Sequence, residues 1–257
     1  MLTTWFRSIR SVLVCAIVVI ATRGMQAATL VSQWTGDGTA LDVIGTNEGV
    51  INNAVNYTGG VIGQAFSFDG GYINVATPNL NSYAAAFSFA TWIRFDAINA
   101  PASIFNFRNA ANSRGFTLEH LFAQPGSLAF YLFKDSGGPV TLLSSSGWQT
   151  GVVYHLAATF NGQSMSIYRD GVLVASRTDA ASPMAQVDSP YLQIGRNTFH
   201  GTTLDGMMDD VRFYSGALTP GEVALLINPA PEPSRSLLAA IGLFAALRRR
   251  GRKSARA

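Results

Sequence analysis

Apolar and polar residues alternate along most of the chain between Leu30 and Ile227, which predicts a long succession of β-strands. The clearest case is the stretch from Phe87 to Phe95, in which every second side chain points to the same side of the strand. That side carries Phe87, Phe89, Thr91, Ile93 and Phe95. Comparable strands are expected at residues 127–133, 152–160, 191–195 and 209–214.

Two local signals mark a hairpin and a helix. Short apolar runs flank Asp170-Gly171, and an Asp-Gly pair in this setting is the strongest short-range signal of a β-hairpin. A helix is expected only at residues 218–227, where Thr219 is the N-cap, a proline follows it and Glu222 lies in the first turn. Many short strands with one helix predict a sandwich or a barrel.

The first 27 residues have the layout of a secretory signal peptide. Arg7 and Arg10 precede the apolar run 12–21, and small residues follow near the expected cleavage point. A run of this length is too short to span a bilayer, which takes about 20 residues, so cleavage is favoured over a retained anchor. We expect residues 1–27 to be removed. Cys15 lies inside this run, so the mature protein would contain no disulfide.

Residues 229–257 have the layout of a sorting or anchoring tail. Its parts, in order, are Pro231, Glu232 and Pro233, an apolar stretch from Leu237 to Leu247, and a basic cluster with Arg248, Arg249 and Arg250. Prolines, an apolar segment and then cations form a stop-transfer pattern. The tail resembles the PEP-CTERM sorting signal of Gram-negative bacteria, which is held transiently in the inner membrane and removed by an exosortase. The alternative is an amphipathic or disordered basic tail.

The basic character of the chain comes from its two ends. Residues 28–230 contain eight cationic and 14 acidic residues, a net charge of −6. Binding to a phosphate backbone needs a clustered cationic face, so this composition argues against a nucleic-acid partner. The low charged content, 13% of the chain, suits a β-rich extracellular domain.

The order of motifs in the body carries a family resemblance. The motifs GQAFSFDGGYINV, FSFATWIRF, GWQTGVVYHLAATFNGQSMSIYRDGVLVAS and LQIGRNTFHGTTLDGMMDDVRFYSGALTPGEV follow one another along the chain. Together they resemble the laminin-G-like, concanavalin A-like lectin/glucanase jelly rolls. The resemblance implies one domain over residues 28–228, an all-β sandwich of two antiparallel sheets. It also implies that the first strand pairs with the last one near DDVRFY.

Several aromatic residues are expected to be structural. Trp92, Phe89, Phe66 and Phe68 occupy strand positions, and aromatic side chains bury the largest area per residue, so core packing is favoured over a ligand platform. His155 follows Tyr154 in an expected strand, where a satisfied sheet histidine is favoured over a ligand or base.

The sequence lacks the carboxyl pair of a glycosidase. A retaining glycosidase needs two carboxyl groups about 5 Å apart, which the glucanase relatives commonly place on one strand. The four glutamates, Glu48, Glu119, Glu222 and Glu232, are far apart in sequence. Asp209-Asp210 and Glu119-His120 are adjacent polar pairs, but neighbours on a strand point to opposite faces. No catalytic residue is therefore assigned. The alternative is a glycan-degrading enzyme that uses aspartates.

A structural calcium ion is expected at the first loop. The stretch TGDGTALDVIGTNEG supplies Asp37, Asp42 and Asn47, with carbonyl groups exposed by glycines, and Ca²⁺ takes six to eight oxygen ligands of this kind. Many relatives hold a calcium where this loop meets the last strand, and the resemblance places their aspartate at Asp209, with Asp210 as a less favoured partner. The alternative is that Asp37 and Asp42 form Asx turns.

The sequence thus favours a non-catalytic, exported β-sandwich that binds a glycan or a surface protein. The tail resemblance implies transient anchoring in the inner membrane and delivery to the surface or extracellular matrix of a Gram-negative-type bacterium. The candidate ligand-binding residues are Arg108, Asn112, Arg114, Trp148, Arg196 and Asn197, with Tyr131 and Phe199 as further aromatic platforms. A purely architectural matrix protein remains an alternative.

Overall fold

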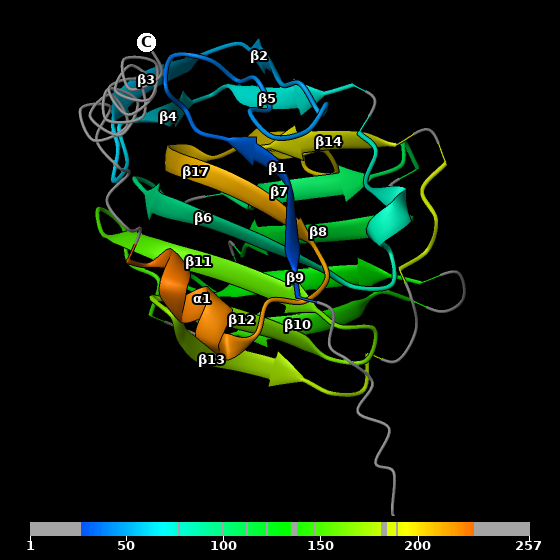
Figure 1. Ribbon diagram of the computed structural model, residues 1–257. Helices are drawn as coiled ribbons and strands as arrows, with labels where there is room; N and C mark the ends of the chain where they lie inside the picture. The colour runs from blue at the N-terminus through cyan, green and yellow to red at the C-terminus, as the bar shows by residue number, and fades with distance from the viewer. Residues whose placement is uncertain are drawn as a thin grey trace, which may run out of the picture.

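The computed structural model describes residues 27–228, apart from residues 77, 99, 112, 122, 135–137, 146, 181–183 and 189. In this part of the chain two antiparallel sheets pack face to face, and a short helix lies on the outer side of one of them (Figure 1). The expected all-β sandwich is therefore confirmed. Among these residues, no helix has the length and apolar character needed to cross a bilayer. The expected signal peptide and sorting tail lie outside the described residues.

The larger sheet has eight strands. Its order is β13-β12-β11-β6-β17-β4-β3, and β1 also pairs with β17. The strands are β1 (Thr29–Trp34), β3 (Val55–Gly59), β4 (Gln64–Asp69), β6 (Phe87–Phe95), β11 (Val153–Phe160), β12 (Met165–Arg169), β13 (Val172–Arg177) and β17 (Asp205–Ser215). The pairing of the first strand with the last one, as the family resemblance implied, is confirmed, because Trp34 lies opposite Val211.

The second sheet has seven strands in the order β10-β9-β8-β7-β14-β5-β2. These strands are β2 (Val50–Asn52), β5 (Tyr72–Val75), β7 (Ala102–Arg108), β8 (Gly115–His120), β9 (Leu128–Phe133), β10 (Val140–Ser144) and β14 (Tyr191–Ile194). A small hairpin of β15 (Arg196–Asn197) and β16 (Thr202–Thr203) follows β14 and packs against β7. A 3₁₀ turn, η1 (Asn81–Tyr83), precedes β6.

The two local signals in the sequence are both confirmed. Asp170 and Gly171 connect β12 to β13 with positive φ angles of 50° and 75°, as a tight two-residue hairpin turn requires. Helix α1 (Pro220–Leu226) begins after Thr219, whose hydroxyl accepts a hydrogen bond from the Glu222 backbone N–H. The Glu222 carboxylate in turn accepts from the Thr219 N–H, which completes a capping box.

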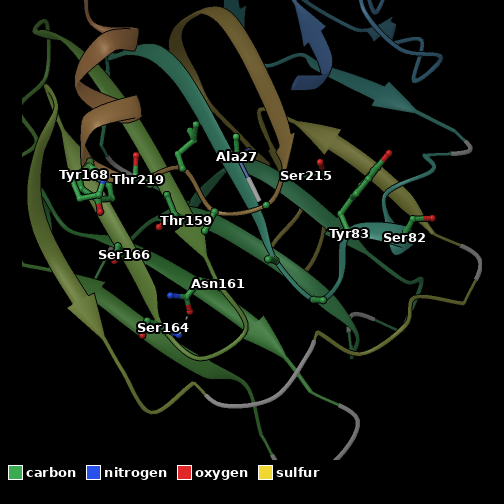
Figure 2. A pocket seen from close by; sticks show the side chains of 16 residues that line it. Ala27, Ser82, Tyr83, Thr159, Asn161, Ser164, Ser166, Tyr168, Ser215 and Thr219 are labelled. Atoms are coloured by element: carbon green, nitrogen blue, oxygen red, sulfur yellow. Dashed lines mark hydrogen bonds between the residues drawn. The ribbon is translucent and has the colours of Figure 1, made fainter. Parts of the chain in front are cut away.

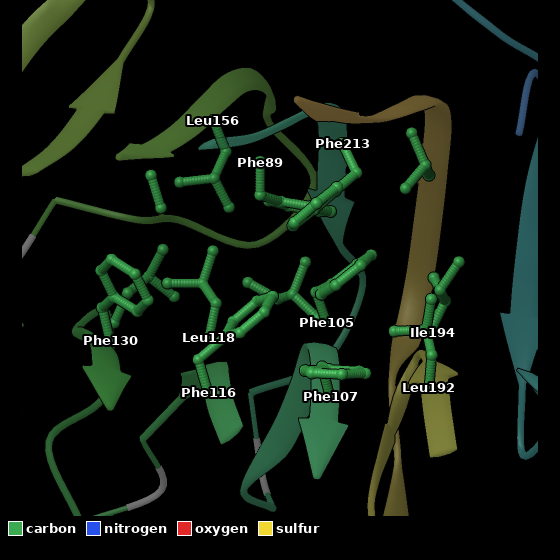
Figure 3. Packing of buried hydrophobic residues seen from close by; sticks show 14 of the residues in the cluster. Phe89, Phe105, Phe107, Phe116, Leu118, Phe130, Leu156, Leu192, Ile194 and Phe213 are labelled. Carbon is green, nitrogen blue, oxygen red and sulfur yellow. The ribbon is translucent and has the colours of Figure 1, made fainter. Parts of the chain in front are cut away.

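The core between the sheets is built mainly from phenylalanines (Figure 3). Phe105 and Phe116 of the seven-stranded sheet stack on each other with ring centroids 5.5 Å apart, and both stack on Phe213 of the opposite sheet, at 6.0 and 6.1 Å. Burying one such side chain stabilises the fold by about 1.5–3 kcal/mol. This aromatic layer fixes the separation of the two sheets.

Trp92 corrects one of the expectations for the core. Phe89 is buried between the sheets, whereas Trp92 is three positions further along β6 and therefore points to the outer side. There its ring meets the edge of the His155 ring, with centroids 5.1 Å apart. Within β6 the odd-numbered residues face the core, so Trp92 lies outside the core that Phe66, Phe68 and Phe89 share.

Candidate functional site

A cleft of about 290 Å³ lies on the outer face of the seven-stranded sheet. Strands β7, β8 and β9 form its floor: β7 and β8 contribute mainly polar outward residues, and β9 contributes the rings of Tyr131 and Phe133. The loop of the β15–β16 hairpin forms one wall. The lining comprises Ser103, Asn106, Arg108, Thr117, Glu119, Tyr131, Phe133, Pro139, Asn197, Thr198, Phe199 and His200.

Asn197 shapes the hairpin wall and also reaches the floor of the cleft. Its side-chain oxygen accepts hydrogen bonds from the backbone N–H groups of Phe199 and His200, at 3.0 and 3.1 Å. Its amide nitrogen donates to the Glu119 carboxylate at 2.7 Å. The loop is thereby held so that Phe199 is 76% exposed at the rim of the cleft.

Glu119 is the carboxyl group of the cleft floor. It accepts hydrogen bonds from Asn197 and from the Ser103 hydroxyl, the latter at 3.4 Å. Burial raises its pKa to about 7, although hydrogen bonds from Ser103 and Tyr131 and the charge of Arg108 oppose the rise. The groups that donate hydrogen bonds to this carboxyl are all neutral. Because its pKa is about 7, Glu119 gains or loses its proton near neutral pH.

Arg108 is the cation of the cleft and is only 8% exposed. Its guanidinium lies 3.5 Å from the centroid of the Phe133 ring and donates to the Thr117 hydroxyl at 3.2 Å. Its Nε atom is buried and has no hydrogen-bond partner among the described residues. Burial lowers the pKa of Arg108 to about 10, so the guanidinium stays charged at neutral pH.

A chain of hydroxyl and amide groups connects the floor to the hairpin. The Thr117 hydroxyl donates to the Asn106 side-chain oxygen at 2.8 Å, and the Asn106 amide donates to the Thr198 hydroxyl at 2.9 Å. The Thr198 and Tyr191 hydroxyls are 2.7 Å apart. Each of these groups is held in one orientation before any ligand arrives, which lowers the entropic cost of binding.

The cleft gathers some of the residues expected to bind a ligand. Arg108, Asn197 and the platform residues Tyr131 and Phe199 all line it. Arg196 lies next to it and stacks on Tyr72 at 4.4 Å.

Two of the other expected ligand residues lie elsewhere, and a third cannot be placed. The Arg114 guanidinium donates to the Gln186 carbonyl and does not line the cleft. Trp148 is 2% exposed and packs against Phe95 and Tyr154, so its ring offers no face to a ligand and that expectation is wrong. Asn112 lies outside the described residues.

The expected calcium ligands separate into two groups. Asp42 and Asn47 are committed to the fold of the first loop. Asp42 accepts four backbone hydrogen bonds, from Gln33, Ile44, Gly45 and Asn47. The Asn47 amide donates to Ser32, and its oxygen accepts from the Asn79 N–H. Their side-chain oxygens therefore accept hydrogen bonds that stabilise the loop conformation. For Asp42 this agrees with the Asx-turn alternative.

Asp37 and Asp209 lie close enough for the charge of Asp37 to raise the pKa of Asp209. Asp209 lies at a bulge in β17 and is fully buried. One of its oxygens accepts from the Val61 and Ile62 N–H groups at 2.7 and 2.8 Å, whereas the other has no partner among the described residues. Burial raises its pKa to about 6, and the negative charges of Asp210 and Asp37 add to the rise.

The loop between β3 and β4 brings both carboxylates close. Asp37 accepts from the Gln64 N–H at 2.7 Å, and a Cβ atom at Gly60 would lie 2.5 Å from an Asp209 oxygen. A partnerless buried carboxylate oxygen beside a second carboxylate fits a hard cation such as Ca²⁺. Asp210 instead pairs with Arg212 at 2.7 Å, which takes it away from this point.

His155 lies on the outer face of the eight-stranded sheet, away from the cleft. It is 3% exposed, and its Nδ1 atom has no hydrogen-bond partner among the described residues. It is thus a buried sheet histidine, as expected, but its Nδ1 atom is not satisfied by any described residue. Burial, together with the nearby Arg212 charge, lowers its pKa to about 4 against the opposing charge of Asp210, so the ring is neutral at physiological pH.

The family profile of the concanavalin A-like lectin/glucanases superfamily, of laminin G type, matches residues 69–224, which is more than half of the chain. The chain belongs to this superfamily. The resemblance that the sequence motifs carried is thus confirmed. No curated protein is similar to the chain at a significant level.

Several solved structures share the concanavalin A-like fold with this domain. Domain 4 of AbnA, a GH43 extracellular arabinanase from Geobacillus stearothermophilus solved with arabinotriose, has a TM-score of 0.58 and 21% identity, covering 79% of this chain and 100% of that domain. The binding domain of botulinum neurotoxin DC, solved with rat synaptotagmin II, has a TM-score of 0.62 and 15% identity over 77% of this chain. The chain spans about half of that neurotoxin domain, 51%. These identities show a shared fold.

The concanavalin A-like domain has a second hollow, of about 480 Å³, at the other sheet (Figure 2). Tyr83 and Tyr168 lie on opposite sides of it, Thr159 and Ser166 extend from β11 and β12, and Ser164 comes from the loop between these strands. Its lining contains hydroxyl groups and small apolar residues but no carboxylate, histidine, lysine or arginine among the described residues. It therefore lacks the charged groups that the cleft brings together.

Proposed function

We propose that this protein is a non-catalytic carbohydrate-binding domain and that the cleft over β7, β8 and β9 is its binding site. One observation carries the proposal: an exposed phenylalanine stands beside a floor of buried, oriented polar groups. Phe199 offers an apolar ring face at the rim, and Asn106, Thr117 and Asn197 hold hydrogen-bonding groups below it. A sugar ring presents the same combination of an apolar face and surrounding hydroxyls.

The carboxyl groups of the cleft favour binding over catalysis. Glu119 is the only carboxyl residue in the described lining. Hydrolysis of a glycosidic bond in the usual way needs a second carboxyl group within about 5–9 Å across the cleft. The domain of AbnA, which has the same fold, was solved with arabinotriose. That likeness supports a saccharide ligand of some kind and leaves its identity to experiment.

The test is binding of the full-length protein to an array of neutral and acidic oligosaccharides. We expect Phe199→Ala to weaken binding about tenfold or more, because burying an aromatic face contributes about 1.5–3 kcal/mol. Val172→Ala is the matched control, since Val172 is 65% exposed on β13, outside the cleft lining. Equal losses in the two variants, or no binding to any sugar, would remove the proposal.

We further propose that the protein is exported and that residues 229–257 act as a transient anchor. The order of Pro231-Glu232-Pro233, an apolar stretch and a basic cluster supports this proposal. The intact mass of the protein expressed in a host with an exosortase tests it. Loss of about 25 residues from near Pro231 is expected, by the resemblance to the sorting signal and its stop-transfer order, with release to the cell surface. An uncut tail would count against this route.

A structural Ca²⁺ at Asp37 and Asp209 is the third part of the proposal. When bound, the ion would offset the repulsion between the two carboxylates and join the first loop to β17. Asp42 and Asn47 would hold the loop in shape without contacting the ion, because their side-chain oxygens already accept hydrogen bonds from backbone N–H groups.

A further inference from the structure

The outer face of the seven-stranded sheet contains an unusual share of unsatisfied polar atoms. Seven buried side-chain nitrogen or oxygen atoms of the described residues have no hydrogen-bond partner, and three of them belong to this face. They are Arg108 Nε, Gln193 Oε1 and Arg196 Nε. Native proteins pair nearly all such atoms, so each exception needs an explanation such as a ligand. Of the three, Arg108 lines the cleft. Two of the three atoms belong to cations.

Arg108 is the strongest of these exceptions because it is a desolvated charge. Three ion pairs occur among the described residues, and none of them includes Arg108. Its one hydrogen bond to another described residue goes to a neutral acceptor, the Thr117 hydroxyl. A buried cation without a carboxylate partner is costly, and a guanidinium is well suited to bind a carboxylate through two parallel hydrogen bonds.

Glu119 does not fill this role in the described structure. It hydrogen-bonds to neutral donors, and burial raises its pKa to about 7, so near neutral pH it is partly protonated. The titratable or charged groups that face it are Arg108 from β7, Tyr131 from β9 and, in the same cleft, His200 from the hairpin loop. With Glu119 protonated, Arg108 has the Phe133 ring and the Thr117 hydroxyl as contacts but no negative charge among the described lining residues.

We infer that the cleft recognises an acidic sugar, with the carboxylate of a hexuronate bound by Arg108, and that Glu119 takes up a proton when this sugar binds. The inference rests on the proposed function, since it names the class of saccharide for the same cleft. A ligand carboxylate placed near Glu119 disfavours a second negative charge there, whereas Phe199 contacts the sugar ring whether or not the sugar is acidic.

The experiment compares two probes that differ only in charge. Tetragalacturonate and its fully methyl-esterified form are titrated into the full-length protein by calorimetry at pH 6 and pH 8, at one calcium concentration. We expect the acid to bind at least tenfold more tightly than the ester at pH 6. We also expect its affinity to fall about five- to tenfold by pH 8, with proton uptake visible as a dependence of the heat on the buffer.

Variants assign these effects to residues. Glu119→Gln should remove the pH dependence while keeping the preference for the acid, and Arg108→Gln should remove the preference. Arg108→Lys keeps the charge and provides a second variant in case Arg108→Gln fails to fold, which circular dichroism will show; it should keep part of the preference. Arg114→Gln is the matched control, because Arg114 lies outside the cleft lining, and it should bind as the wild type does.

The outcomes distinguish the acidic-sugar inference from the proposed carbohydrate-binding function. Equal binding of acid and ester, or tighter binding of the ester, would overturn the acidic-sugar inference and leave the carbohydrate-binding function standing. Loss of affinity with rising pH that persists in Glu119→Gln would overturn the role of Glu119. Failure to bind these probes and every sugar of the array would overturn the proposed function itself.

Discussion

Replacing Glu119 by glutamine should change how the stability of the protein depends on pH. The folded state raises the pKa of this carboxyl from 4.5 to about 7, because the group is largely removed from water. The folded state therefore holds a proton that the unfolded state releases between these two values. The stability that this proton contributes is fully present below pH 4.5 and is lost as the pH rises through 7.

The size of the effect follows from the shift. One unit of pKa corresponds to 1.36 kcal/mol, so the wild type should lose about 2–3 kcal/mol of unfolding free energy between pH 5 and pH 8 through Glu119. Glutamine offers an oxygen to the same donors, Asn197, Ser103 and Tyr131, but does not titrate. The stability of Glu119→Gln should therefore exceed that of the wild type increasingly as the pH rises.

Urea unfolding followed by tryptophan fluorescence at pH 5, 6, 7 and 8 measures this difference. Asp209 also has a raised pKa, about 6, but it is present in both proteins and cancels in the comparison. Tyr131→Phe sharpens the test: the Tyr131 hydrogen bond lowers the Glu119 pKa, so its removal should move the loss of stability to higher pH. Parallel curves for wild type and Glu119→Gln, within about 0.5 kcal/mol, would refute the reasoning.

Two further predictions concern the proposed calcium site and the core. Calcium at 100 times its dissociation constant should stabilise the wild type by about 2.7 kcal/mol. Asp209→Asn should abolish the shift in thermal unfolding, whereas Asp42→Asn should lower the melting temperature and keep the shift; a full calcium response in Asp209→Asn would exclude the site. Phe105→Ala removes a ring that stacks on Phe116 and Phe213, and we expect a loss of about 3–5 kcal/mol in urea unfolding. A loss below about 1 kcal/mol would show that the aromatic layer repacks freely.

Local patterns in the sequence identified many of the elements, but not the sides on which all residues fall. The alternation identified β6, and the Asp-Gly pair identified the turn between β12 and β13. Trp92 was assigned to the core because of its residue type, although its position in the alternation places it on the outer side. Where residue type and period disagree in a strand, the period decides.

The residues expected to bind calcium show a second limit. Asp42 and Asp37 lie in one glycine-rich loop, and the sequence gives both the same chemistry. They differ because the loop closes around Asp42, whose oxygens accept four backbone N–H groups. Asp37 instead accepts from the Gln64 N–H, and its charge acts on Asp209, which is far away in the sequence. Which of the two carboxylates accepts backbone hydrogen bonds depends on the conformation of the folded loop.

The cleft could not be assembled from sequence because its residues come from segments far apart in the chain. Glu119 and Asn197 are 78 positions apart, and Ser103 lies opposite Glu119 only through the pairing of β7 with β8. The alternation within β8 nevertheless gave a usable signal: Phe116 and Leu118 point inward, and Thr117 and Glu119 point outward. In β7 a bulge after Ser103 interrupts the alternation, so that both Ser103 and Asn106 line the cleft.

The same strands thus build the aromatic core with one face and the cleft with the other. Phe105 and Phe107 fix the height of β7 against the opposite sheet, and Asn106 and Arg108 are carried on the same backbone. A core substitution that shifts β7 should therefore disturb the spacing of Arg108 and Glu119 as well as the stability. In Phe105→Ala, weaker saccharide binding in the fully folded population would reveal this coupling, and unchanged affinity would show that the cleft is held by its own hydrogen bonds.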